Sequence, residues 1–95
     1  MAYTYPFAQA NHDMKSQVWW KGTPLQGYDS KEWMLDVCGN TIRWADHGDT
    51  NSKFGWEIDL VFPKEHGGSD DLSNLQPLFW KTNRQKGDTV GWTCP

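Results

Sequence analysis

The sequence predicts a small single domain of the α+β class, and three observations support this prediction. The chain has 95 residues, a length typical of one domain with a modest core. Residues 54–61 alternate apolar and polar side chains, as a strand with one buried face does. Helix signatures stand on either side of this strand, with a possible cap at Asp29 and a glycine, Gly87, just after a helix-compatible run.

Residues 1–28 show neither a helical nor a strand period, so we expect a coil that wraps around the domain. Val18, Trp19 and Trp20 are its expected anchors, because a free tail would hardly keep large aromatic side chains in water. The rest of the chain, residues 29–95, is expected to form the domain proper.

The domain proper is expected to begin with an N-terminal helix at about residues 30–38. Asp29 stands at the cap position, and Glu32 lies where a capping box needs a glutamate. Two strand-like segments follow, residues 41–44 and 54–61. The polar, turn-forming residues between them predict an antiparallel hairpin.

The second of these strands is expected to end at Pro63, which has no amide hydrogen to donate. Gly67 and Gly68 allow the chain to turn back. A short returning strand is expected at residues 75–77, and a closing helix at residues 78–86.

Composition limits the function of the protein. A net charge of −3 and a pI near 5.4 argue against a protein that coats nucleic acid by bulk charge. The seven tryptophans are expected mainly in the core. Two cysteines, Cys38 and Cys94, are too few for a disulfide-rich scaffold, and their pairing stays open. Without a signal-peptide or membrane-spanning pattern, we expect a soluble, cytoplasmic protein with no membrane partner.

An ordered set of acidic, glycine, asparagine and basic residues runs through the second half of the chain: Glu57, Asp59, Pro63, Gly67, Gly68, Asn74, Leu75, Asn83, Lys86 and Gly87. This order resembles the HNH nuclease motif, which reads acidic residue, Asp-His, Pro, Gly-Gly, Asn-Leu, and Asn or His before Lys-Gly. The resemblance implies a ββα-metal (HNH) finger at about residues 56–87. At the position of the motif's first His, this chain has Leu60.

The resemblance implies a metal-dependent endonuclease that hydrolyses DNA phosphodiesters. Asp59 and Asn83 match the family's metal ligands, and their oxygens suit Mg²⁺, Mn²⁺ or another divalent cation. Asn74 matches a residue that braces the loop around the general base. Leu60 occupies the place of that base and has no lone pair to accept a proton. Since loss of a general base removes on the order of 10²–10⁴ in rate, we expect an inactive or strongly impaired enzyme.

The basic residues of the closing helix are expected to hold DNA backbone phosphates: Lys81, Arg84 and Lys86. No structural zinc is expected. The family's paired zinc cysteines align with Cys38 and Thr41 and with Phe79 and Thr82, which leaves a single thiol.

Several alternatives stay open. His66 is the nearest histidine in sequence that could replace the missing base, although a loop histidine beside two glycines is more often solvated; His47 and His12 are weaker candidates. The finger could instead be a non-catalytic nucleic-acid- or protein-binding module on a degenerate HNH scaffold. Leu60 could be a natural loss or an engineered change. The DNA target, its strandedness and the oligomeric state are not determined by the sequence.

Overall fold

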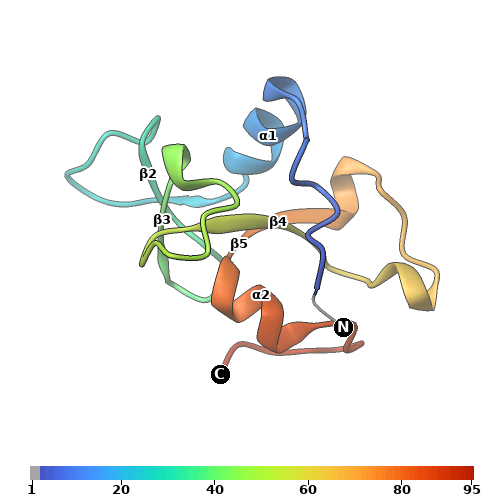
Figure 1. Cartoon of the computed structure of the whole chain (residues 1–95). Helices are drawn as coiled ribbons and strands as arrows, with labels where there is room; N and C mark the ends of the chain where they lie inside the picture. The colour runs from blue at the N-terminus through green and yellow to red at the C-terminus, as the bar shows by residue number, and fades with distance from the viewer. Residues whose placement is uncertain (1–2) are drawn as a thin grey trace.

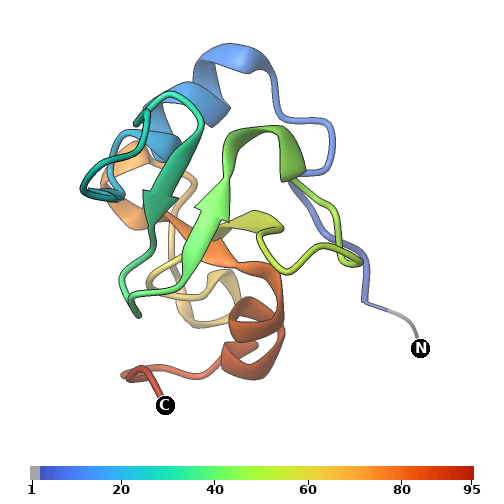
Figure 2. The ribbon, with the colours of Figure 1, turned by 90° about the vertical axis from the view of Figure 1, so that its left-hand side faces the viewer.

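The strands of the protein form two separate antiparallel sheets. The computed structural model describes residues 3–95, so the first two residues of the expected wrapping segment lie outside it. One sheet has three strands in chain order, β1 (Thr23–Pro24), β2 (Trp33–Leu35) and β3 (Thr41–Arg43). The other is a two-stranded pair, β4 (Trp56–Leu60) and β5 (Leu75–Phe79). Figure 2 shows β2 and β3 side by side.

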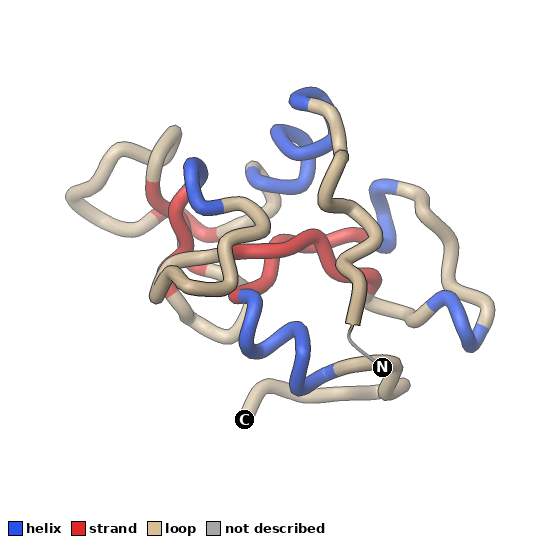
Figure 3. The backbone as a smooth tube through the Cα atoms, in the orientation of Figure 1, coloured by secondary structure: helices blue, strands red, loops and turns tan. Residues whose placement is uncertain are grey.

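Two α-helices lie on opposite sides of the β4–β5 pair, as Figure 1 shows. They are α1 (His12–Trp19) and α2 (Trp80–Lys86). Long loops and three single 3₁₀ turns connect the described elements (Figure 3). The turns are η1 (Trp44–Asp46), η2 (Lys64–His66) and η3 (Leu72–Asn74). The predicted small α+β domain is therefore confirmed.

The expected helix at residues 30–38 is wrong. The Asp29 carbonyl accepts hydrogen bonds from the amides of Glu32 and Trp33, which closes a turn that leads into β2. The Glu32 carboxylate does not return to the cap but accepts two hydrogen bonds from Arg43 on β3. Pairing with β3 thus overrides the local capping signature.

The expected coil at residues 1–28 is also wrong in part, because it contains α1. Asn11 caps this helix, its side-chain oxygen accepting a hydrogen bond from the amide of Met14, which satisfies one of the free amides of the first turn. Of the three expected anchors, Val18 and Trp19 are buried and Trp20 is 53 % exposed. With its buried residues confined to the last turn, α1 shows little helical period in the sequence.

The expected hairpin between residues 41–44 and 54–61 does not form. β3 pairs with β2, whereas β4 pairs with β5 over its whole length. The intervening residues close a compact turn in which Ser52 Oγ donates to Asp46 Oδ2 at 2.6 Å. His47, which directly follows η1, forms an isolated parallel β-bridge with Trp56, the first residue of β4.

The final strand and helix differ only at their bounds from the expectation. β5 continues to Phe79, so α2 begins at Trp80 rather than at residue 78. The register sets Asp59 opposite Gln76 and Leu60 opposite Leu75. Strand, connecting loop, strand and helix therefore follow in the ββα order that the motif implies.

Aromatic side chains form much of the core. Trp19 and Trp56 are at most 1 % exposed, and their ring centroids lie 5.3 Å apart. Trp44 packs against both rings. Tyr5 is also buried, and its hydroxyl is hydrogen-bonded to His47 Nε2 at 2.9 Å while it accepts from a β4 amide. The N-terminal segment is thus fixed to the same core as the β4–β5 pair.

A disulfide between Cys38 and Cys94 joins the turn after β2 to the C-terminal segment. The sequence left this pairing open, and the helix expected at residues 30–38 would have ended at Cys38. Cys38 instead lies half-buried in a turn between two strands. Within the part of the chain that the structure describes, no helix has the length and apolar character needed to cross a membrane.

We predict that His47 makes the stability of the domain depend on pH. Burial, aided by the positive charge of Lys15, lowers the pKa of His47 from 6.5 to about 4. Between these values the unfolded chain binds a proton that the folded protein does not, so the free energy of unfolding falls as the pH falls through this window.

Urea denaturation at a series of pH values measures this dependence. His47→Gln keeps a polar atom near Tyr5 but does not titrate, so the variant should lose less stability than the wild type on acidification from about pH 6.5 to about pH 4. Identical pH dependence in both proteins contradicts the prediction.

Candidate active site

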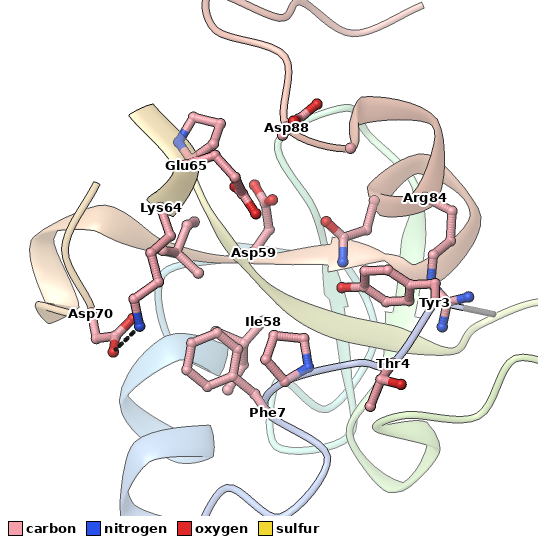
Figure 4. Close-up of a pocket in the computed structure, with 15 residues that line it drawn as sticks. Tyr3, Thr4, Phe7, Ile58, Asp59, Lys64, Glu65, Asp70, Arg84 and Asp88 are labelled. Carbon is pink, nitrogen blue, oxygen red and sulfur yellow. Dashed lines mark hydrogen bonds and ion pairs between the residues drawn. The ribbon is translucent and has the colours of Figure 1, made fainter. Parts of the chain in front are cut away.

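A cavity of about 850 Å³ opens beside β4, between the N-terminal segment and α2. Figure 4 shows the side chains that surround it. They come from four parts of the chain: the N-terminal segment, β4, the loop after β4, and the end of α2 with the residues that follow. The lining residues are Tyr3, Thr4, Pro6, Phe7, Ile58, Asp59, Leu60, Pro63, Lys64, Glu65, Asp70, Asn83, Arg84, Gly87 and Asp88.

Asp59 is held in the wall of this cavity by one partner on each carboxylate oxygen. Its side chain is 5 % exposed. Oδ2 accepts a hydrogen bond from Gln76 Nε2 at 2.9 Å, and Oδ1 lies 3.2 Å from Lys86 Nζ. Burial raises the pKa of Asp59 above its ordinary value, and the contacts with Gln76 and Lys86 offset part of this effect. The carboxylate is therefore fixed in direction at the β4 side of the cavity.

Asn83 lies on α2 and lines the same cavity as Asp59. Its amide nitrogen donates to Glu57 Oε1 at 3.0 Å. Glu57 is fully buried and also receives two hydrogen bonds from Arg84, at 3.2 Å and 2.9 Å. Because the amide nitrogen of Asn83 is committed to Glu57, its amide oxygen is the atom left to accept a bond from, or to ligate, another group.

The three basic residues expected to hold phosphates have different environments. Lys81 is exposed on α2. The Arg84 side chain is 32 % exposed and paired with Glu57. Lys86 is 3 % exposed, and its ammonium group donates to the carbonyl of Leu60 at 2.8 Å beside Asp59. Lys86 thus faces inward in this conformation, and only Lys81 presents an unpaired cation of the three.

Leu60 lines the cavity next to Asp59 and packs partly against the core. None of the lining residues in the described chain is a histidine. His66 ends η2 with an exposed side chain, His47 is bonded to Tyr5, and His12 packs its ring against Trp44. The cavity wall therefore holds no imidazole in place of the missing one.

Asn74 ties the loop after β4 to the start of β5. Its side-chain oxygen accepts from the amide of Phe62 at 2.9 Å. Its nitrogen donates to the carbonyl of Phe62 at 3.0 Å and to that of Ser69 at 2.8 Å. These three bonds are what a loop-bracing role requires, and they fix the segment that follows Leu60.

Three of the four positions that align with the family's zinc cysteines, Cys38, Phe79 and Thr82, take part in hydrogen bonds around Asp36 and Asn40. Asp36 is buried, and its carboxylate accepts bonds from the backbone amides of Cys38, Asn40 and Phe79. Asn40 Nδ2 also donates to Thr82 Oγ1 at 3.3 Å. Among residues 3–95, no group of three or more His, Cys, Asp or Glu side chains is arranged to hold a metal ion.

Several residues that line or support the cavity were not predicted as site residues from the sequence. Gln76 donates a hydrogen bond to Asp59. This role could have been suspected from the sequence, because Gln76 is a polar residue directly after the Asn-Leu of the motif. Tyr3, Glu65 and Asp88 line the cavity, but no local pattern marks them, because they reach it through tertiary structure alone.

The oxygen atoms that face the cavity are of the kind that a hard divalent cation prefers. Asp59 offers a carboxylate, and Asn83 offers an amide oxygen at the same cavity. Mg²⁺ needs only one or two protein ligands, since it keeps most of its water molecules. The ammonium group of Lys86 shares the Asp59 carboxylate, so a cation there would bind next to an existing positive charge.

Comparison with known proteins assigns the family. The family model for HNH endonuclease matches residues 36–89, which is more than half of the chain. The protein belongs to the HNH endonuclease family. No curated protein and no solved structure matches the chain.

We predict that Asp59 and Lys86 are strongly coupled. Both are almost fully buried, and removal of one charge leaves the other without its partner. Lys86→Met or Asp59→Asn alone should lower the free energy of unfolding by about 3 kcal/mol. The double variant should lose much less than the sum of the two. Urea denaturation of the four proteins in the cycle measures this, and additive losses would show that the two charges are independent.

Proposed function

We propose that this domain is a metal-dependent DNA endonuclease of the HNH type whose cleavage is strongly impaired by Leu60. The observation that carries the proposal is the presence of Asp59 and Asn83, from β4 and α2, in the wall of one cavity that Leu60 also lines. The family assignment supports a nuclease-type role.

The residues of the cavity supply binding and orientation in this proposal. Asp59 and Asn83 would hold the cation, which would lower the charge of the scissile phosphate and stabilise the leaving oxygen. Gln76 and Lys86 keep the Asp59 carboxylate aimed at the cavity, and Glu57 keeps the Asn83 amide nitrogen turned away from it. Rigid positioning of this kind is what phosphoryl chemistry needs from a protein.

Charge around the cavity supports the need for a cation. Three acidic side chains are paired with three basic ones, Asp59 with Lys86, Asp70 with Lys64, and Glu57 with Arg84. Glu65 and Asp88 remain as further carboxylates in the wall. Because the wall carries no excess positive charge, a phosphate group would be repelled there unless a bound cation reversed the sign.

The missing step is proton transfer. An attacking water molecule must lose a proton, and the aliphatic side chain of Leu60 cannot accept one. Exposed Lys81 is the candidate contact for a neighbouring backbone phosphate, with Arg84 beside the cavity. Such contacts give affinity without reading sequence, so the domain is expected to bind DNA better than it cuts it.

We predict that Leu60→His restores cleavage. The imidazole would stand next to Asp59 at the cavity, and a positioned general base is worth on the order of 10²–10⁴ in rate. Nicking of supercoiled plasmid with magnesium or manganese ions, followed over time on agarose gels, measures the gain.

Asp59→Ala in the Leu60→His background is the matched control and should abolish the restored nicking. If Leu60→His nicks no faster than the wild type, the site assignment is wrong. Fast nicking by the unaltered chain would show instead that Leu60 does not impair it.

A second candidate function is a non-catalytic binding module on the same scaffold. The buried Asp59–Lys86 pair favours it, because a carboxylate already neutralised by an ammonium group can serve stability alone.

Calorimetric titration with manganese ions separates the two candidates. The nuclease proposal predicts binding that disappears in Asp59→Ala and persists in Asp29→Ala, a change at an exposed turn residue outside the cavity wall. Absence of binding by the wild type supports the module instead.

A further inference from the structure

The aromatic ring of Tyr3 stands at the rim of the cavity with much of its surface accessible. Tyr3 is 54 % exposed and is one of the lining residues. Its ring lies over the Arg84 guanidinium group, with the carbon Cζ of Arg84 4.3 Å from the ring centroid. Figure 4 shows the two side chains next to each other at one end of the cavity. One ring face is therefore covered by a cation, while about half of the residue stays accessible.

Both residues of the Tyr3–Arg84 pair are anchored to the buried part of the domain. Arg84 donates two hydrogen bonds to Glu57, which is fully buried in β4. Two residues further along from Tyr3, the buried ring of Tyr5 fixes the same N-terminal segment to the core. An exposed aromatic ring on a fixed base loses little conformational freedom when a flat group packs against it.

One section of the cavity wall suits an uncharged, flat group better than a phosphate. An apolar section of the wall is formed by Pro6, Phe7 and Ile58, of which Phe7 and Ile58 are labelled in Figure 4. The basic side chains of the cavity are all paired with acidic ones, while Glu65 and Asp88 add negative charge. A neutral nucleobase can enter such a space without a cation. The scissile phosphate needs the cation proposed at Asp59 and Asn83, and the other backbone phosphates are better accommodated outside the cavity, where Lys81 is exposed.

We propose that the Tyr3–Arg84 pair is a stacking platform for an unpaired nucleobase, and that the preferred nucleic acid of this domain is single-stranded DNA. The inference rests on the proposed function and names the strandedness of its substrate. Bases of a duplex are already stacked and paired, so one of them reaches Tyr3 only after it is flipped out, which costs a few kcal/mol. Bases of a single strand stack on an aromatic ring without this cost, and the stacking tolerates any sequence.

Fluorescence anisotropy with a labelled single-stranded oligonucleotide and with its duplex tests the proposal. The wild type should bind the single strand more tightly than the duplex. Tyr3→Ala should weaken single-strand binding roughly tenfold, within the range for loss of one aromatic–base stack. Tyr3→Phe keeps the ring and should bind as the wild type does. Tyr28→Ala is the matched control, because Tyr28 is 61 % exposed but does not line the cavity.

The outcomes separate this inference from the function on which it rests. Absence of binding to either DNA at low salt contradicts the nucleic-acid function itself. Binding that Tyr3→Ala leaves unchanged, or equal affinity for duplex and single strand, overturns only the stacking platform. Displacement of the oligonucleotide by a nucleoside monophosphate at comparable concentration would make a free nucleotide the ligand and overturn the single-strand proposal. Circular dichroism of each variant confirms that it folds.

Discussion

The buried carboxylate of Glu57 is the contact on which the site depends. It ties β4 to two consecutive residues of α2, Asn83 and Arg84, through three hydrogen bonds. A helix of seven residues is too short to be stable alone, so its position must come from such tertiary contacts. Glu57 therefore sets both the direction of the Asn83 amide and the position of the Arg84 group that packs against Tyr3.

A second constraint acts where other members of the family use zinc. The Asp36 carboxylate gathers three backbone amides, one of them at Phe79, immediately before α2. A carboxylate that accepts several amide hydrogen bonds can be buried at low cost. Here it joins the turn after β2 to the end of β5, and Asn40 adds a bond to Thr82 in the first turn of the helix. The helix is thus held at its start by Asp36 and in its second half by Glu57.

The second half of the fold could be predicted from the sequence, whereas the first half could not. The ββα order of residues 56–87 follows from a motif in which Pro63 and Asn74 fix the loop by local chemistry. The capping signature at Asp29 was outweighed by strand pairing that the local sequence does not reveal, and α1 has too few buried residues to produce a helical period. Likewise, Asp59 could be selected from the motif, whereas the approach of Tyr3 to Arg84 joins residues at opposite ends of the chain and has no local signal.

The disulfide at Cys94 gives the C-terminal segment a dependence on its chemical surroundings. Asp88, which lines the cavity, belongs to the short stretch between α2 and this bond. With the bond intact, the stretch is anchored at both ends. In a compartment rich in glutathione, where protein thiols are kept reduced, it would be anchored only where it leaves the helix, near the hydrogen bond from Thr89 to Lys86. One wall of the cavity would then be mobile in the cytosol, whereas the same wall would be fixed outside the cell.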